Sequence, residues 1–191
     1  MRFVVNLFAM LTVALVVGFG LSYLALTSWS PVGTMKVGPW VAWPEVGAPE
    51  PDPYTNAYLA RQAVLQLGRS EGIRFVAGTD SDGRALDRNC RYRIDGSTPV
   101  AAFWTLIAVD AKGVDIARPD GMAEVVGTSL PRPADGSIEV RVSKRLAPGY
   151  WYEITGEGRF SLVLTLYDAS IFSGLGSQVE KLPAILNEGC A

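Results

Sequence analysis

An uncharged apolar run at the N-terminus, from Phe3 to Leu26, constrains the fold of this chain more than any other feature. As a helix with a rise of about 1.5 Å per residue, the run would be roughly 36 Å long. That length crosses the ~30 Å hydrocarbon layer of a membrane with some tilt. The sequence therefore predicts that residues 1–28 form an N-terminal transmembrane anchor, with residues 3–26 inside the lipid bilayer. Its apolar character is interrupted only by Asn6, Thr12 and Ser22.

A cleaved signal peptide is the alternative for this segment. The apolar core of a signal peptide is usually only about 7–15 residues long and is followed by a small-x-small cleavage site. The run here is longer, and Ala25-Leu26-Thr27 is a poor cleavage site. Arg2 and the α-amino group are the only cations before the apolar run, and the next charged residue after the run is Lys36. The positive-inside rule thus predicts a single pass through a bacterial inner membrane, with a cytoplasmic N-terminus and a periplasmic C-terminal domain.

Composition excludes several classes of function. The 191 residues carry 17 Lys and Arg against 19 Asp and Glu, with no basic run, so nucleic acid is not an expected partner. Histidine is absent, which excludes a Ser-His-Asp relay, a His-ligated metal or haem and a His pH switch. Two cysteines are too few for a four-thiolate zinc site, and no metal or other cofactor is expected.

The two cysteines, Cys90 and Cys190, predict a disulfide. Both lie in an oxidising compartment if the anchor has the predicted orientation, and two is the number that pairs. The bond would attach the C-terminal tail to the strand around Cys90 and close a loop of about 100 residues, worth up to ~4.7 kcal/mol in the chain-entropy model. A redox-active pair is the alternative, but the Cys-x-x-Cys spacing that it would use is missing.

Proline and glycine separate the anchor from the domain. Residues 29–52 predict an extended linker, because proline is excluded from helix interiors and inner strands. Trp40 and Trp43 within it are expected to pack on the domain rather than to stack on a ligand. At Asp52-Pro53, an N-cap carboxylate followed by a proline predicts the start of a helix over residues 53–67.

The rest of the domain, within residues 53–191, reads as β-structure. From residue 73 onwards apolar and polar residues alternate, as in Ile138/Val140/Val142, which is typical of half-exposed antiparallel strands. The runs 100–109 and 160–167 are apolar at both phases and predict central strands. Regular turn signals such as Asp-Gly separate the strands, and no internal repeat is visible. This pattern predicts a mainly β fold, an antiparallel β-sandwich or jelly-roll-like domain with one packed helix.

Two groups of carboxylates are candidates for metal binding or catalysis. Asp80-Ser81-Asp82-Gly83, followed by Asp87, could wrap a calcium ion, but the EF-hand spacing is not met and an Asp-Gly hairpin turn explains the stretch better. A second group could supply a glycosidase-type pair. Nothing in the sequence brings two of its members together, so a carboxylate-based hydrolase is the third hypothesis and no catalytic residue is assigned. That group is Glu124, Glu139, Glu153 and Glu157.

The predicted binding site combines arginines and aromatic rings. Arg91 and Arg93 share one face of a strand and could hold a carboxylate or phosphate, although a solvated face balanced by cross-strand acids is the simpler alternative. Consecutive strand residues cannot all face one side, so at least one ring of Tyr150-Trp151-Tyr152 is expected near the surface, where it could stack on a sugar or lipid. The predicted site residues are Tyr150, Trp151, Tyr152, Arg91 and Arg93.

The order of several motifs resembles the bacterial domain-of-unknown-function family 1214, from about Gly38 to Cys190. The resemblance implies a β-rich, sandwich-like domain and brings no catalytic motif. The family also occurs fused behind a companion domain of unknown function, family 1254, which this short, membrane-anchored form lacks. The resemblance thus implies that a separate 1254-type protein is the partner. The motifs are Cys90-Arg-Tyr-Arg-Ile-Asp-Gly96, Phe103-Trp-Thr-Leu106, Asp110-Ala-Lys-Gly113, Gly136-Ser-Ile-Glu-Val-Arg-Val-Ser143, Pro148-Gly-Tyr-Trp151 and Phe160-Ser-Leu-Val-Leu-Thr-Leu-Tyr-Asp168.

These observations favour a non-enzymatic envelope protein whose exported β-domain acts as an interaction or accessory module for another envelope protein. A tether and a linker would raise the effective concentration of such a module near a membrane partner. A small-molecule or glycan-binding periplasmic domain is the alternative hypothesis. An aromatic-lined concave pocket would favour the binder, and a wide apolar patch would favour the protein partner.

Overall fold

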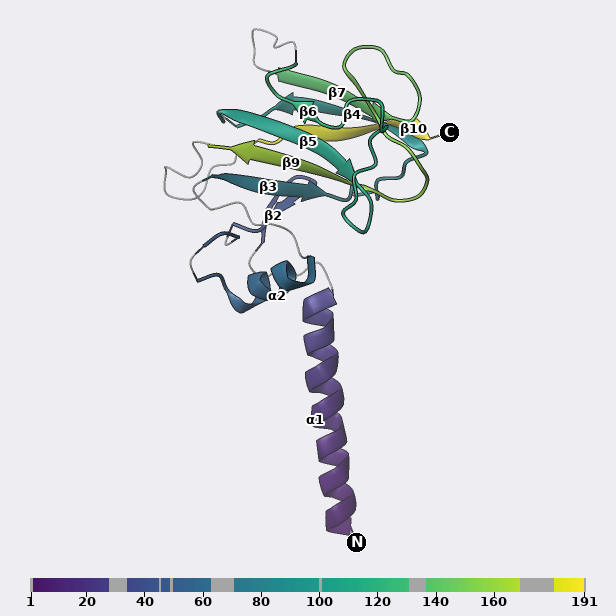
Figure 1. Ribbon diagram of the computed structural model, residues 1–191. Helices are drawn as coiled ribbons and strands as arrows, with labels where there is room; N and C mark the ends of the chain where they lie inside the picture. Colours follow the sequence, from purple (N-terminus) through teal and green to yellow (C-terminus); the bar gives the residue numbers. More distant parts are fainter. Residues whose placement is uncertain are drawn as a thin grey trace.

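A long apolar helix and a two-layered β-domain make up the part of the chain that the structure describes. The computed structural model describes residues 2–27, 34–44, 46–48, 50–62, 71–99, 101–130, 137–168 and 181–190. The helix α1 (Arg2–Thr27) projects away from the β-domain (Figure 1). Over Arg2–Leu24 its mean hydropathy is 2.3, and none of this window is buried inside the protein. The predicted helix is therefore present and is long and apolar enough to cross a membrane.

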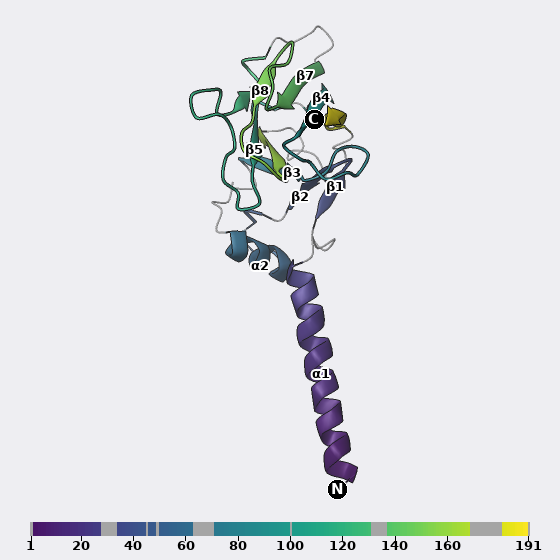
Figure 2. The ribbon, with the colours of Figure 1, turned by 90° about the vertical axis from the view of Figure 1, so that its right-hand side faces the viewer.

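The β-domain consists of two sheets, as predicted for a mainly β sandwich. One sheet has six strands in the order β1-β2-β3-β9-β5-β6, and the other has four in the order β10-β4-β7-β8. Figure 2 shows the two sheets on opposite sides of the domain, with β5 and β3 in one and β4 and β7 in the other. The strands are β1 Met35–Val37, β2 Trp40–Ala42, β3 Gly72–Ala77, β4 Cys90–Ser97, β5 Phe103–Val109, β6 Val125–Val126, β7 Ser137–Ser143, β8 Trp151–Glu153, β9 Ser161–Tyr167 and β10 Ala184–Cys190.

The core lies between the sheets and joins side chains from both. In β9 every residue from Leu162 to Leu166 is buried, which confirms the prediction of a central strand that is covered on both faces. In β5 only one phase is fully buried, that of Trp104, Leu106 and Ala108, while Phe103 on the other phase is exposed. The apolar run at 100–109 is therefore a strand next to the centre, but its outer face remains partly open.

One strand pair departs from the antiparallel prediction. β8 pairs with β7 in parallel, whereas every other strand pair in the described sheets is antiparallel. The chain must therefore run back along β7 between the two strands. It does so in residues 144–150, where the N–H of Arg141 donates to the carbonyl of Tyr150 at 2.8 Å. Gly149 takes a φ of 82° there, which favours glycine.

The segment predicted as an extended linker contains a hairpin. β1 and β2 pair with each other, and β2 pairs with β3, so residues 35–42 extend the six-stranded sheet. The prolines do not prevent this because Pro39 lies in the turn and Pro44 follows the second strand. Trp40 is fully buried, and its Nε1 donates to the carbonyl of Pro183 at 2.8 Å. The linker prediction fails at these residues because burial of the Trp40 ring adds them to the domain.

The helix predicted after Asp52 is present. α2 (Pro53–Gln62) begins at the predicted proline, and Oδ1 of Asp52 accepts a hydrogen bond from the N–H of Thr55 at 3.1 Å. This is the N-cap contact that the sequence predicted. The last residues of the prediction, 63–67, lie outside the described residues.

The same hairpin follows β3 and β5, a repeat that the sequence did not reveal. In each copy Oδ1 of an aspartate accepts the N–H groups two and four residues later, at 3.0 and 2.8 Å for Asp80 and at 2.8 and 2.9 Å for Asp110. The glycine three residues after the aspartate has a positive φ, 84° at Gly83 and 78° at Gly113. The Asp80 carboxylate is thus used by its own turn, in agreement with the hairpin explanation of this acidic stretch.

Candidate functional site

The outer face of the four-stranded sheet brings together most of the residues predicted to bind a ligand. On β4 the alternation directs Tyr92 and Ile94 into the core and leaves Arg91 and Arg93 outside. Arg93 lies opposite Arg141 of β7, which in turn lies opposite Trp151 of β8. The two predicted arginines and one predicted ring therefore share a surface, with Arg141 between Arg93 and Trp151.

Carboxylates neutralise the arginines on this face. Arg93 pairs with Asp95 and, from Nε, with Oε1 of Glu188 at 3.1 Å. Arg141 pairs with Oε1 of Glu139 at 2.7 Å and approaches Oε2 of Glu188 at 3.9 Å. Each pair is partly exposed, so we expect at most about 1 kcal/mol from each. An anionic ligand would have to displace these carboxylates, which agrees with the simpler explanation of a balanced strand face.

Glu188 joins Arg93 and Arg141, a role that no pattern in the sequence predicts. Glu188 lies on β10 at a register shift between Asn187 and Gly189 in the pairing of β10 with β4. Arg91 also contacts this residue, through a hydrogen bond of 3.4 Å to its carbonyl. The strand phase of Arg141 was visible in the sequence, but the position of Glu188 depends on an irregular register that periodicity does not encode.

Trp151 is half-buried rather than freely exposed. Its Nε1 donates to the carbonyl and to Oγ of Ser143, both at 3.1 Å. Ser143 is itself buried, and its hydroxyl donates to the carbonyl of Arg145 at 2.6 Å. The indole is therefore held in place by the end of β7, and only part of its ring is available for contacts.

Tyr152 does not belong to the surface site. Its side chain is fully buried, and its hydroxyl accepts from the N–H of Ala108 at 3.2 Å and donates to the carbonyl of Ala123 at 3.0 Å. Burial raises the pKa of Tyr152 to about 12. Tyr152 thus connects β8 to β5 of the other sheet. The prediction that it binds a ligand at the surface is corrected, because the alternation along β8 directs its side chain into the core.

Tyr150 lies at the edge of the core. It is half-buried against the core cluster, and its hydroxyl lies 3.2 Å from Sδ of Met122. Burial raises the pKa of Tyr150 above its usual value. Of the three predicted rings, only Trp151 therefore remains on the face of Arg91 and Arg93. Tyr150 lies directly before the first residue of β8.

The glutamates of the hydrolase hypothesis are not assembled into a buried pair. Glu139 pairs with Arg141, and Glu153 pairs with Arg118 at 3.2 Å. Among the described residues Asp80 is the only buried carboxylate, and no group of three metal-binding side chains occurs in that part of the chain. A glycosidase-type pair needs two carboxyl groups about 5–9.5 Å apart across a cleft. This arrangement gives the hydrolase hypothesis no support.

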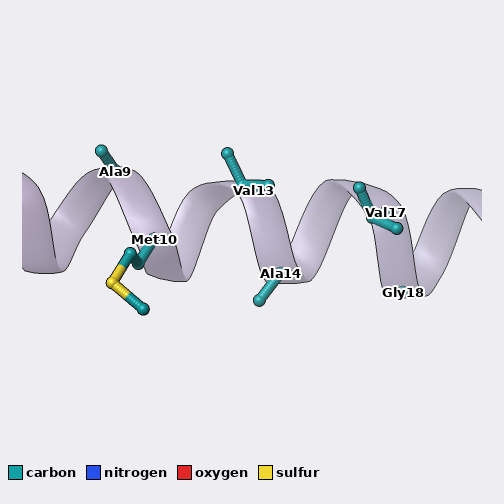
Figure 3. Close-up of a pocket in the computed structure, with 6 residues that line it drawn as sticks. All are labelled: Ala9, Met10, Val13, Ala14, Val17 and Gly18. Carbon is teal, nitrogen blue, oxygen red and sulfur yellow. The ribbon is translucent and has the colours of Figure 1, made fainter.

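A shallow apolar depression of about 630 Å³ runs along α1 (Figure 3). This helix projects away from the β-domain (Figure 1). An added Cβ at Gly18 would meet no atom within 4 Å, because no other part of the described chain packs there. The depression contains no aromatic ring and lies within the predicted membrane span, so it does not provide the aromatic pocket expected of a glycan binder. It is lined by Ala9, Met10, Val13, Ala14, Val17 and Gly18.

Comparison of the fold with solved structures finds four matching chains, among them one from Vibrio parahaemolyticus and one from Burkholderia cenocepacia. The crystal structure of the VPA0106 protein from Vibrio parahaemolyticus has a TM-score of 0.56 and 16% sequence identity, over 71% of this chain and 35% of that one. An uncharacterised protein from Burkholderia cenocepacia gives a TM-score of 0.40 and 14% identity, over 62% of this chain and 29% of that one. The first likeness shows a shared fold, and this chain spans only 35% of the length of the Vibrio protein.

Comparison of the sequence gives a family. No curated protein matches the chain. Residues 71–171 match the family described as "Protein of unknown function (DUF1214)", from the start of β3 to just beyond β9. Because this match covers more than half of the 191 residues, the chain belongs to the DUF1214 family.

Proposed function

We propose that this chain is a membrane-anchored envelope protein whose exported β-domain is an accessory module that binds another envelope protein. In this proposal α1 crosses the inner membrane once, the N-terminus is cytoplasmic and the β-domain is periplasmic. The observation that carries it is an apolar helix of mean hydropathy 2.3 that the β-domain leaves wholly uncovered. A helix of this kind is stable in a bilayer and would expose its apolar side chains in water.

The disulfide supports an exported domain. Cys90 and Cys190 are bonded to each other, and such structural bonds persist in oxidising compartments such as the periplasm. A reporter fused after Ala191 tests the orientation. Alkaline phosphatase, which folds only in the periplasm, should be active in this position, and a cytoplasmic fluorescent reporter should fluoresce poorly. The opposite result would overturn the proposed orientation.

Binding to a protein, rather than catalysis, is supported by the arrangement of charged groups. Arg93 and Arg141 on the outer face of the small sheet are already paired with carboxylates, and of the candidate glutamates Glu139 and Glu153 are paired with arginines while Glu124 and Glu157 are exposed. In addition, the shared fold makes up 35% of the Vibrio chain, so it occurs elsewhere together with a larger remainder. We propose that the partner of this β-domain is a separate protein of the companion family 1254.

Affinity purification of the full chain from a detergent extract tests this function. We expect one stoichiometric membrane or periplasmic protein to co-purify with it. The control is a chain in which residues 1–28 are replaced by an unrelated transmembrane helix, which should keep the partner if the β-domain makes the contact. A monomer that carries a bound metabolite would instead support the alternative, a small-molecule or glycan-binding domain.

A further inference from the structure

The C-terminal end of β10 is held to the domain by the disulfide and by two residue pairs. β10 is an edge strand, and its regular pairing with β4 ends at Asn187, where the register shifts. Beyond the shift Gly189 pairs with Arg91 and Cys190 pairs with Cys90, so that the C-terminus lies beside β4 (Figure 2). Cys190 is exposed, whereas Cys90 is 8% exposed. Without the S–S bond this end of the strand would be the first part to fray.

Glu188 lies in this end of the strand and contacts three arginines, Arg91, Arg93 and Arg141, which we call the arginine site. Its Oε1 accepts a hydrogen bond from Nε of Arg93 at 3.1 Å, and its Oε2 lies 3.9 Å from Nε of Arg141. Its carbonyl accepts a hydrogen bond of 3.4 Å from Nη2 of Arg91. The carboxylate of Glu188 thus lies between guanidinium groups of two neighbouring strands, in the position that the carboxylate of a ligand would take.

The charges of the arginine site and its acids balance while Glu188 is in place. Asp95 pairs with Arg93 within β4, and Glu139 pairs with Arg141 within β7, so both acids stay beside the site independently of β10. Together with Glu188 they match the three arginines one for one. Movement of Glu188 away from the site would leave three cations against two carboxylates and would remove one contact from each arginine.

Thiol–disulfide exchange can break the bond without a change in the core. Because Cys190 is the exposed partner, its Sγ is the sulfur that an external thiolate can reach. Attack by one thiolate of a dithiol breaks the S–S bond, releases Cys90 as a thiolate and leaves Cys190 in a mixed disulfide. The second thiol of the dithiol then displaces Cys190. Two electrons pass to the protein, the dithiol becomes a disulfide, and its two protons end on the two cysteine thiols.

We propose that the Cys90–Cys190 bond is an exchange site for an external dithiol, and that its reduction releases Glu188 and opens the arginine site to the carboxylate of another molecule. A carboxylate is the ligand class because a carboxylate fills the site in the oxidised chain. In that state the domain blocks its own site, and reduction removes the block. The inference goes beyond the proposed function and holds whichever protein binds the β-domain.

Reduction of the folded full chain in detergent micelles tests the exchange site. Dithiothreitol is the probe, and a maleimide mass tag counts the free thiols on a gel. We expect Tyr152→Phe and Gly127→Ala, which lower the free energy of unfolding, to be reduced at the wild-type rate within twofold, because exchange takes place in the folded state. If reduction needed global unfolding, each variant would react faster by the factor by which its unfolded population rises. That result would overturn the exchange site.

Reactivity of the arginines towards phenylglyoxal, located by mass spectrometry, tests the release of Glu188. Reduction should raise the reaction rate at Arg93 and Arg141 at least threefold. Glu188→Gln should raise it to the same extent in the oxidised chain, so this part of the test does not depend on how reduction affects folding. Glu153→Gln is the matched control, because its carboxylate pairs with Arg118 and not with the arginine site. It should leave both rates unchanged.

Glutarate, a small dicarboxylate, tests the opened site. At a millimolar concentration it should slow the reaction of phenylglyoxal with Arg93 and Arg141 at least threefold in the reduced chain and in Glu188→Gln. It should have no effect on the oxidised wild-type chain. Chloride at the same ionic strength is the control and should protect neither arginine.

Three further outcomes would overturn the inference. An unchanged rate at the arginine site after reduction would show that Glu188 stays in place without the bond. Equal protection by glutarate in the oxidised and reduced chains would show that Glu188 does not block the site. Failure of glutarate to protect the reduced chain would show that the site does not bind a carboxylate. None of these measurements uses the envelope partner, so the proposed function is tested separately by co-purification.

Discussion

Cys190 lies directly opposite Cys90 in the ladder between β10 and β4, and a disulfide joins the two residues across a sequence separation of 100. β10 is an edge strand of its sheet, so it has a strand neighbour on one side only. The bond therefore holds the last residue pair of the β10–β4 ladder together at the C-terminal end of β10, where an edge strand would otherwise fray.

Removing this bond should lower the free energy of unfolding. For Cys90→Ser combined with Cys190→Ser we expect a loss of about 2–4.7 kcal/mol, because the unfolded chain regains the entropy of an open loop. Urea denaturation measures the loss. Reductant should destabilise the wild-type protein and slow its migration on a gel, but should leave the double variant unchanged. A wild-type melt that is insensitive to reductant would contradict the prediction.

Trp40 should attach the β1–β2 hairpin to the rest of the domain. Trp40→Phe removes the donor to the carbonyl of Pro183 and part of a fully buried ring, so we expect a loss of about 1–3 kcal/mol in the free energy of unfolding. Limited proteolysis should then cut faster within residues 34–44. Lys36→Ala, which alters an exposed side chain of the same hairpin, is the control and should change neither measurement.

Gly127 allows Trp104 to pack closely against it. A Cβ at this position would lie 2.4 Å from Nε1 of Trp104, and the N–H of Gly127 also donates to the carbonyl of Trp104 at 2.8 Å. Because both partners are fixed, we expect Gly127→Ala to destabilise the domain by about 1–3 kcal/mol. Thr128→Ala, at the exposed neighbouring position, should cost less than about 0.5 kcal/mol. Equal melting temperatures for the two variants would show that the loop moves aside.

Local patterns predicted those parts of the structure that local physics decides. The N-cap at Asp52, the apolar phases of β9 and the pairing of the only two cysteines follow from residue type and spacing. The proline content around residues 35–42 predicts a linker, whereas the burial of Trp40 makes these residues a hairpin of the domain. This burial depends on contacts with residues that are distant in sequence, such as Pro183.

The candidate site could be predicted only in part, because strand alternation is local whereas cross-strand neighbours depend on residues that are distant in the sequence. Strand alternation placed Arg91 and Arg93 outside, but it could not decide which ring of the Tyr150-Trp151-Tyr152 triplet would face the core until the phase of β8 was known. Cross-strand neighbours were also invisible in the sequence, because Glu188 reaches Arg93 and Arg141 only when β10, β4 and β7 come together.

The hydroxyl of Tyr152 should stabilise the contact between the two sheets. Tyr152→Phe keeps the buried ring but leaves the N–H of Ala108 and the carbonyl of Ala123 without this partner, so we expect a loss of about 1–3 kcal/mol at neutral pH. Tyr150→Phe is the matched control. Its hydroxyl meets only the weak acceptor Sδ of Met122, and the expected loss is below about 0.5 kcal/mol. Similar losses for the two variants would mean that the buried hydrogen bonds contribute little.

Tyr152 should also make the domain less stable in alkaline solution. Its pKa is about 12 when folded, raised by burial, against about 10 in an unfolded chain. Between these values the folded state retains the proton that the unfolded state loses, so the free energy of unfolding falls as pH rises, by at most about 1.4 kcal/mol per pH unit from this group. The stabilisation is complete below pH 10 and is lost by about pH 12. Tyr92, whose pKa is also raised by burial, should contribute a slope of the same sign. Urea denaturation at pH 8, 10 and 11 should therefore show a steeper decline for the wild-type protein than for Tyr152→Phe, and parallel declines would contradict the assignment of this titration to Tyr152.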